Sequence, residues 1–174
     1  MSLRNIIVVP DPLLKQIAQP IETITEDVKK QALDMVETMY DAPGIGLAAN
    51  QIGCLNRIFV MDTNYRKEES SRKPIIMINP EIVWKSEEIS VMEEGCLSIP
   101  QQYAEVERPK SVRVKYIDID GEVREHIGED LESHCIQHEL DHLNGILFID
   151  YLSRLKRNMI LRKVEKMKKD GIIL

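Results

Sequence analysis

The chain has 174 residues, of which 43% are hydrophobic and 30% are charged, and its formal net charge is −6. This length predicts one domain, residues 1–174, with room for a substantial core. The composition is that of an ordinary globular protein, and the negative charge gives no reason to expect nucleic acid as the main partner.

The first residues, MSLRNIIVVPDP, have neither a signal-peptide core nor a transit pattern. No apolar run approaches the length needed to cross a bilayer, so we expect no membrane partner. The cysteines Cys54, Cys96 and Cys135 are an odd and sparse set, which disfavours a disulfide framework. We therefore expect a reducing compartment, the cytoplasm.

The first predicted helix starts after Thr25, which can cap its N-terminus, and Glu26 and Asp27 suit its first turn. It should end near Ala42, because the residue before a proline disfavours helical backbone angles.

A glycine motif, GIGLAANQ at 44–51, follows this helix. Its glycines and small residues permit close backbone approach to a ligand or to another segment. Neither a dinucleotide fingerprint nor a P-loop is present, which excludes phosphate binding on these grounds. On its own, Gln51 is best interpreted as a surface glutamine.

The middle of the chain is predicted to be mainly β-structure, with a turn, GCLS, at 95–98 and a flexible surface loop at 64–73. Apolar and β-branched runs predict strands at 57–61, at 74–84 with an interruption at Pro80, at 89–92, and in an antiparallel hairpin at 111–127.

A helix from about Asp130 to Gly145 carries the sequence HELDH. His138 and His142 lie four residues apart, so both imidazoles can direct a nitrogen at one metal ion. Glu139 can then reach a water at the metal without being a ligand. The alternative is a buried helix with two histidines, but such a match arises by chance in roughly one chain in a hundred or fewer.

The last predicted helix, at 151–170, is amphipathic and basic. Between Ser153 and Lys169, eight residues are Lys or Arg and the one acidic residue is Glu165, which gives a charge of +7. A solvated face and a docking surface for an anionic partner such as ribosomal RNA are both consistent with this charge. Its apolar side is predicted to consist of Leu152, Leu155, Met159, Val164 and Met167.

A catalytic metal site needs a third protein ligand besides two histidines. In one class of metalloprotease it is a further histidine, but Phe148 occupies that position here. Two sources remain open on the residues alone: Glu165 downstream, and the thiolate of Cys96 upstream.

Three motifs, GIGLAANQ (44–51), EGCLS (94–98) and HELDH (138–142), resemble in order and separation the signatures of the peptide deformylase family. The resemblance covers essentially the whole chain, including the helical C-terminal extension of one bacterial subgroup. It implies an α+β fold in which antiparallel β-sheets surround a central metal-binding helix, with an N-terminal and a C-terminal helix. It also implies a hydrolase that removes the formyl group from formyl-methionine of newly made polypeptides and releases formate.

The resemblance implies one divalent ion per chain, commonly Fe²⁺, with Zn²⁺ or Ni²⁺ as alternatives, since a thiolate with two imidazoles suits each of them. The implied general base is Glu139, and the implied donors to the developing oxyanion are the Gln51 side chain and the Leu97 backbone N–H. The implied metal ligands are Cys96, His138 and His142.

The resemblance further implies that backbone near Ile45 and Gly46 pairs with an extended N-formylmethionyl peptide. The apolar slot for methionine is implied to be lined by Met92, Leu131, His134 and Cys135. Two positions depart from familiar members: His134 is usually apolar, and Tyr103 is an arginine in well-known bacterial ones. We expect the slot's shape and the preference for downstream residues to be affected.

Two other functions are possible interpretations of the sequence: a metalloendopeptidase and a catalytically inactive binding protein. A metalloendopeptidase would use Glu165, tolerate loss of Cys96 and cleave internal peptide bonds. A catalytically inactive relative would bind nascent chains or ribosomes through the basic helix, but it would have no need for Glu139. Formate release from a formyl-methionyl tripeptide would separate all three.

Overall fold

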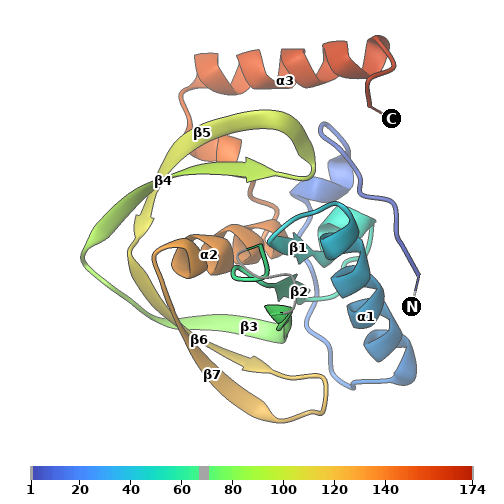
Figure 1. Ribbon diagram of the computed structural model, residues 1–174, viewed down its shortest axis with the longest axis vertical. Helices are drawn as coiled ribbons and strands as arrows, with labels where there is room; N and C mark the ends of the chain where they lie inside the picture. The colour runs from blue at the N-terminus through green and yellow to red at the C-terminus, as the bar shows by residue number, and fades with distance from the viewer. Residues whose placement is uncertain (1, 67–70, 174) are drawn as a thin grey trace.

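The structure, a computed structural model, describes residues 2–66 and 71–173. Its centre is helix α2 (Leu131–Leu143), around which the β-structure is wrapped (Figure 1). The α+β fold expected from the sequence is confirmed, with antiparallel sheets around this helix and further helices near both ends.

Within the described residues, the strands form a five-stranded and a two-stranded sheet, and all neighbouring strands are antiparallel. The larger sheet has the order β1-β2-β3-β6-β7, with bounds Gly46–Ala48, Ile58–Met61, Ile75–Lys85, Ser111–Ile117 and Val123–Glu129. The smaller sheet pairs β4 (Ile89–Cys96) with β5 (Ile99–Pro109).

In the view of Figure 1, helix α3 (Arg154–Lys169) lies above α2 and helix α1 (Glu26–Asp41) lies to its right. The Thr25 side chain accepts the backbone N–H of Val28 at 3.2 Å, which satisfies a free donor of the first turn of α1. Short 3₁₀ helices cover Pro12–Lys15, Ala49–Ile52 and Phe148–Tyr151.

The core is divided into clusters, and one of them includes the apolar side chains of α2. Toward the larger sheet this helix packs through Ile136 and Leu143 against a cluster that includes Phe59, Met77 and Val114. A second cluster joins the β4–β5 hairpin and α3 to the N-terminal segment, through Leu14, Ile99, Val106, Phe148, Ile160 and Val164. Burial of each such side chain stabilises the fold by about 1.5–3 kcal/mol.

Most predicted elements are present, including α1, the β6–β7 hairpin and the helix of the HELDH motif. The strands β1 and β5 were not predicted. Pro80 does not interrupt β3: the strand continues through it with a register shift between Ile78 and Glu81, and Asn79 has a φ of 51°. Residues 67–70 of the predicted surface loop lie outside the described residues.

The apolar side predicted for the last helix is wrong in part. Ile160 and Val164 are its buried residues, whereas Leu155 is 71% exposed and Met159 47%. Leu155 and Val164 are nine residues apart, which is two and a half helical turns, so they cannot share one face. Across the described chain, no helix is long and apolar enough to cross a membrane.

Candidate metal centre

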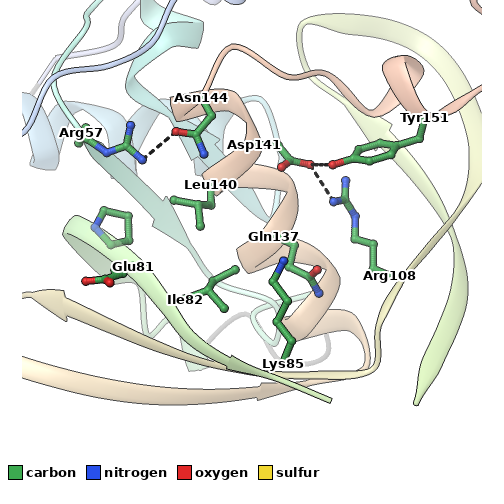
Figure 2. A pocket seen from close by; sticks show the side chains of 11 residues that line it. Arg57, Glu81, Ile82, Lys85, Arg108, Gln137, Leu140, Asp141, Asn144 and Tyr151 are labelled. Carbon is green, nitrogen blue, oxygen red and sulfur yellow. Dashed lines mark hydrogen bonds and ion pairs between the residues drawn. The ribbon is translucent and has the colours of Figure 1, made fainter. Parts of the chain in front are cut away.

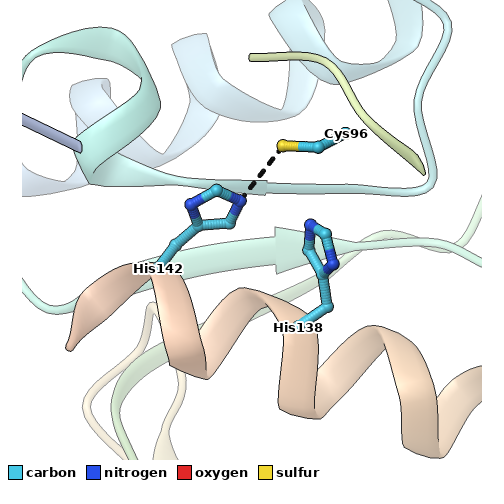
Figure 3. A group of neighbouring side chains, drawn as sticks. All are labelled: Cys96, His138 and His142. Carbon is cyan, nitrogen blue, oxygen red and sulfur yellow. Dashed lines mark hydrogen bonds between the residues drawn. The ribbon is translucent and has the colours of Figure 1, made fainter. Parts of the chain in front are cut away.

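Three side chains converge where the β4–β5 hairpin meets α2 (Figure 3). The sulfur of Cys96 and one nitrogen each of His138 and His142 all lie within 4.8 Å of one another. The Cys96 sulfur is 3.3 Å from Nε2 of His142, and the two imidazole centroids are 4.9 Å apart. The spacing of four residues therefore places both rings on one face, as the sequence predicted.

Cys96 is held by the tight end of the β4–β5 hairpin. It pairs with Ile99 across a turn, and the carbonyl of Ser98 accepts the N–H of Val9 at 3.0 Å. A Cβ at Gly95 would lie 2.5 Å from the Tyr103 ring, so glycine immediately before the cysteine lets this side chain pack across the strand. The sulfur is thus presented to α2 by a rigid segment.

The carboxylate of Glu94 fixes which nitrogen of His138 is free. His138 Nδ1 donates to Glu94 Oε1 at 3.0 Å, which leaves Nε2 available to a metal ion. Burial alone would raise the pKa of Glu94, but hydrogen bonds from His134, His138 and Arg108 outweigh it and hold this pKa well below its usual range. Glu94 is therefore ionised and can only accept.

These three donor atoms fit a divalent cation. Burial lowers the pKa of His142, which favours the neutral imidazole that binds metals. One thiolate with two imidazoles suits Fe²⁺, Zn²⁺ and Ni²⁺ alike. Glu165, the other candidate ligand, lies on α3 with a 65% exposed side chain and pairs with Lys169, outside this cluster.

Glu139 lies beside the cluster on the same helix and is 4% exposed. Burial raises the pKa of its carboxyl to about 7, and its Oε1 has no hydrogen-bond partner among the described residues. A Cβ on Gly46 would be 2.4 Å from Glu139 Oε2, so only glycine lets β1 approach this carboxylate so closely. Such a group can take up and release a proton near neutral pH.

Gln51 is buried rather than on the surface, with 1% exposure. Its Oε1 accepts the backbone N–H of Ala48 at 3.0 Å, which fixes the orientation of the amide. Its Nε2 donates to Ser98 Oγ at 3.1 Å and lies 3.5 Å from the Cys96 sulfur. The amide N–H₂ group is therefore directed at the metal cluster.

A cleft of about 760 Å³ opens onto these groups. Among the residues predicted for the site, its lining contains Ile45, Gly46, Gln51, Cys96, Leu97, Leu131, His138 and Glu139.

Three residues predicted for the methionine slot are not among the residues that line this cleft. His134 is bonded to Ser90 and Glu94, and Cys135 is buried behind Gly46 with its thiol 3.6 Å from the carbonyl of Ile45. Met92 is half-buried on β4.

Sequence reasoning missed two residues that organise the centre. Glu94 stands inside the EGCLS motif, two residues before the cysteine, so the motif itself carried a signal for it. Arg108 had none: its guanidinium donates to both oxygens of Glu94, at 2.6 and 2.9 Å, from the far end of β5.

Comparison with known proteins gives a consistent result. The sequence model of the polypeptide deformylase family matches residues 3–158. A peptide deformylase of Rhodopseudomonas palustris is 54% identical over 172 residues, which are 99% of this chain and 98% of the relative. The crystal structure of a peptide deformylase from Legionella pneumophila has a TM-score of 0.92 at 43% identity, with 99% of each chain covered. A peptide deformylase from Ehrlichia chaffeensis, crystallised in complex with actinonin, has a TM-score of 0.89 at 38% identity and covers 95% of this chain and 98% of its own.

Proposed function

Because the chain belongs to the peptide deformylase family, we propose that Cys96, His138 and His142 hold its catalytic metal ion and that Glu139 is its general base. The protein is a metal-dependent hydrolase that removes the formyl group from nascent peptides. The observation that supports the residue assignment is the convergence of one sulfur and two nitrogens within 4.8 Å, beside a buried carboxylate.

When bound, a divalent ion supplies Lewis acidity, which activates water and polarises a carbonyl. Glu139 would accept the proton of the attacking water and deliver it to the departing amine of the methionine. Its pKa of about 7 suits both transfers, because it can hold or release a proton near neutral pH.

The Gln51 amide and the Leu97 backbone N–H would donate to the formyl oxygen as it gains negative charge. The bond from Gln51 Oε1 to the Ala48 N–H keeps the amide nitrogen on the cluster side, so little reorganisation is needed during the reaction. Each donor of this kind contributes on the order of 10²–10³ in rate.

The peptide would bind as an added strand along β1. This strand is at the edge of the larger sheet, and Gly46 within it lines the cleft beside Glu139. An edge strand offers backbone groups to an extended chain, which supports pairing near Ile45 and Gly46 without demanding a particular peptide sequence. The methionine side chain would lie toward Leu131, with Met92 and Cys135 behind it.

Formate release from a formyl-methionyl tripeptide tests the assignment. Cys96→Ala should lose bound metal and activity together, whereas Glu139→Ala should keep metal and lose turnover. Glu165→Ala is the matched control and should behave as wild type. Activity that survives Cys96→Ala but not Glu165→Ala, with cleavage of internal bonds, would instead support a metalloendopeptidase. Actinonin, bound in the Ehrlichia relative, should inhibit through the same cleft.

We propose Fe²⁺ as the native ion, with Zn²⁺ or Ni²⁺ as replacements. Ferrous iron beside a thiolate is oxidisable, so activity should decline in air or peroxide and persist under anaerobic handling. Full activity after aerobic purification, in protein that contains no iron, would overturn this choice.

We also propose that α3 docks on the ribosome, that residues 1–174 act as one catalytic domain, and that the enzyme works in the cytoplasm, where nascent chains arise. The support for docking is the basic outer face of α3, on which Arg162 and Lys166 flank exposed Leu155 and Met159.

Arg162→Glu with Lys166→Glu should weaken ribosome co-sedimentation and leave tripeptide hydrolysis intact. Lys85→Glu with Lys115→Glu, which changes charge on the larger sheet, is the control. Truncation is a poorer test, because Ile160 and Val164 are part of the core.

A further inference from the structure

His134 lies one turn before His138 on α2 and is 2% exposed. Both of its ring nitrogens have partners. Nδ1 is 2.9 Å from Glu94 Oε2, and Nε2 is 2.8 Å from Ser90 Oγ. The ring therefore joins β4 to α2 through two polar contacts, and neither Ser90 nor Glu94 is among the residues that line the cleft.

The protonation of this ring follows from its partners. Arg108 donates to both oxygens of Glu94, and the carboxylate accepts a further hydrogen bond from Nδ1 of His134. The Ser90 hydroxyl can then donate to Nε2, and a neutral imidazole satisfies both contacts.

Glu94 accepts four hydrogen bonds from described residues, two on each oxygen. Oε2 receives Arg108 Nε at 2.6 Å and His134 Nδ1 at 2.9 Å. Oε1 receives Arg108 Nη2 at 2.9 Å and His138 Nδ1 at 3.0 Å. A carboxylate has about four acceptor sites, so this one is saturated.

The two histidines hold different oxygens of the same carboxylate from one face of one helix. Arg108 donates to both oxygens from β5, and the two histidines add one bond to each oxygen from α2. Without the bond from His134, His138 would be the one α2 side chain with a hydrogen bond to this carboxylate among the described residues.

We propose that His134 is a positioning residue of the metal centre: through Glu94 it fixes the orientation of the His138 ligand, and it does not select the methionine side chain. The inference rests on the proposed function for the identity of the ligands. Groups that orient a ligand in this way typically change metal affinity or activity 10–100-fold when they are removed.

The test is the affinity for Co²⁺, measured by competition with a chelator and by the thiolate-to-metal absorption band. His134→Leu should weaken Co²⁺ binding about 10–100-fold and shift the band, with little change in KM for a formyl-methionyl tripeptide. His126→Leu, a histidine paired with Glu132 outside this network, is the control and should bind Co²⁺ as wild type.

A second pair of variants covers the case in which His134→Leu does not fold. Asparagine can place its amide N–H₂ near the position of Nδ1, and glutamine near that of Nε2. His134→Asn should therefore bind Co²⁺ more tightly than His134→Gln, because it alone keeps a donor to Glu94. Equal affinities in this pair would overturn the proposal.

Wild-type Co²⁺ affinity in His134→Leu, with a changed preference between methionine and other apolar side chains, would also overturn it and assign the residue to the slot. Loss of the absorption band in Cys96→Ala checks that the probe occupies the proposed site. These readouts do not require turnover, so a wild-type protein that releases no formate would reject the proposed function and leave this comparison intact.

Discussion

A cleft and a cavity, each lined partly by polar side chains, lie on two sides of α2. The two differ in whether the polar groups of the helix have hydrogen-bond partners there. On the cleft side, Oε1 of Glu139 and Nδ1 of His142 have no hydrogen-bond partner among the described residues. On the opposite side is a cavity of about 370 Å³ (Figure 2), where Asp141 accepts from Arg108 at 2.8 Å and from Tyr151 at 2.7 Å.

Arg57 in the second cavity is likewise engaged, with bonds to the carbonyls of Ala18 and Leu143 and to Asn144. A concave shape and polar lining residues are found on both sides of α2, so they do not by themselves identify the side on which the reaction occurs. A buried polar group without a partner costs about 1–3 kcal/mol, and the unpaired Oε1 of Glu139 beside the metal cluster is consistent with a role in proton transfer.

The largest expected contrast between the two sides is between neighbouring carboxylates of α2. Glu139→Gln should lower kcat/KM for a formylated tripeptide by roughly 10²–10⁴ while metal content is retained, because it removes the proton carrier. Asp141→Asn, on the side of α2 that faces the cavity in Figure 2, should lower activity far less. Comparable losses of kcat/KM in steady-state assays of both variants would contradict the proposed difference between the two sides.

Two buried glutamines give the next contrast. Gln51→Leu should reduce kcat by about 10²–10³, since its amide faces the metal cluster. Gln137→Leu removes bonds to Pro109 and Ser133 and should instead lower the free energy of unfolding, by about 0.5–1.5 kcal/mol for each bond lost. Denaturant unfolding measured beside turnover separates the two effects, and a stability loss without a rate loss in Gln51→Leu would be the contrary result.

The raised pKa of Glu139 predicts a pH-dependent stability in protein stripped of metal by a chelator. Between about pH 4.5 and 7 the folded state holds a proton on this carboxyl that the unfolded state lacks, so stability falls as pH rises through this window. Above pH 7 the charged carboxylate costs on the order of 3 kcal/mol.

Replacing this carboxylate with an amide checks that sign. Metal-stripped Glu139→Gln should melt at a higher temperature than wild type at pH 8, and the gap should close toward pH 5. A gap that is independent of pH would reject the assigned pKa.

The smallest effect is expected from substitution of Tyr151, which is 53% exposed and lines the cavity in Figure 2. Tyr151→Phe removes one hydrogen bond to Asp141 and should lower the free energy of unfolding by about 0.5–1.5 kcal/mol. Because Arg108 still holds Asp141 and Glu94, kcat/KM should change by less than about tenfold. A larger loss of rate would mean that the residues of this cavity affect the metal centre directly.

The sequence alone determined the features that depend on local spacing. A spacing of four residues puts His138 and His142 on one helical face, Thr25 and Pro43 bound α1, and Gly121 marks the turn of the β6–β7 hairpin. Each of these rests on interactions between residues close in the chain, which a periodic pattern records directly.

Only the tertiary structure decided the rest, because the partners are far apart in sequence. The short edge strand β1 has no pattern of its own and exists through pairing with β2, and the buried face of α3 depends on what it packs against. The position of His134 is of the same kind. The family resemblance placed it in a slot, whereas the structure pairs it with Glu94, 40 residues away in sequence, and Glu94 is in turn held by Arg108. Burial makes those long-range bonds obligatory, since a carboxylate removed from water must be satisfied by whichever donors the fold brings to it.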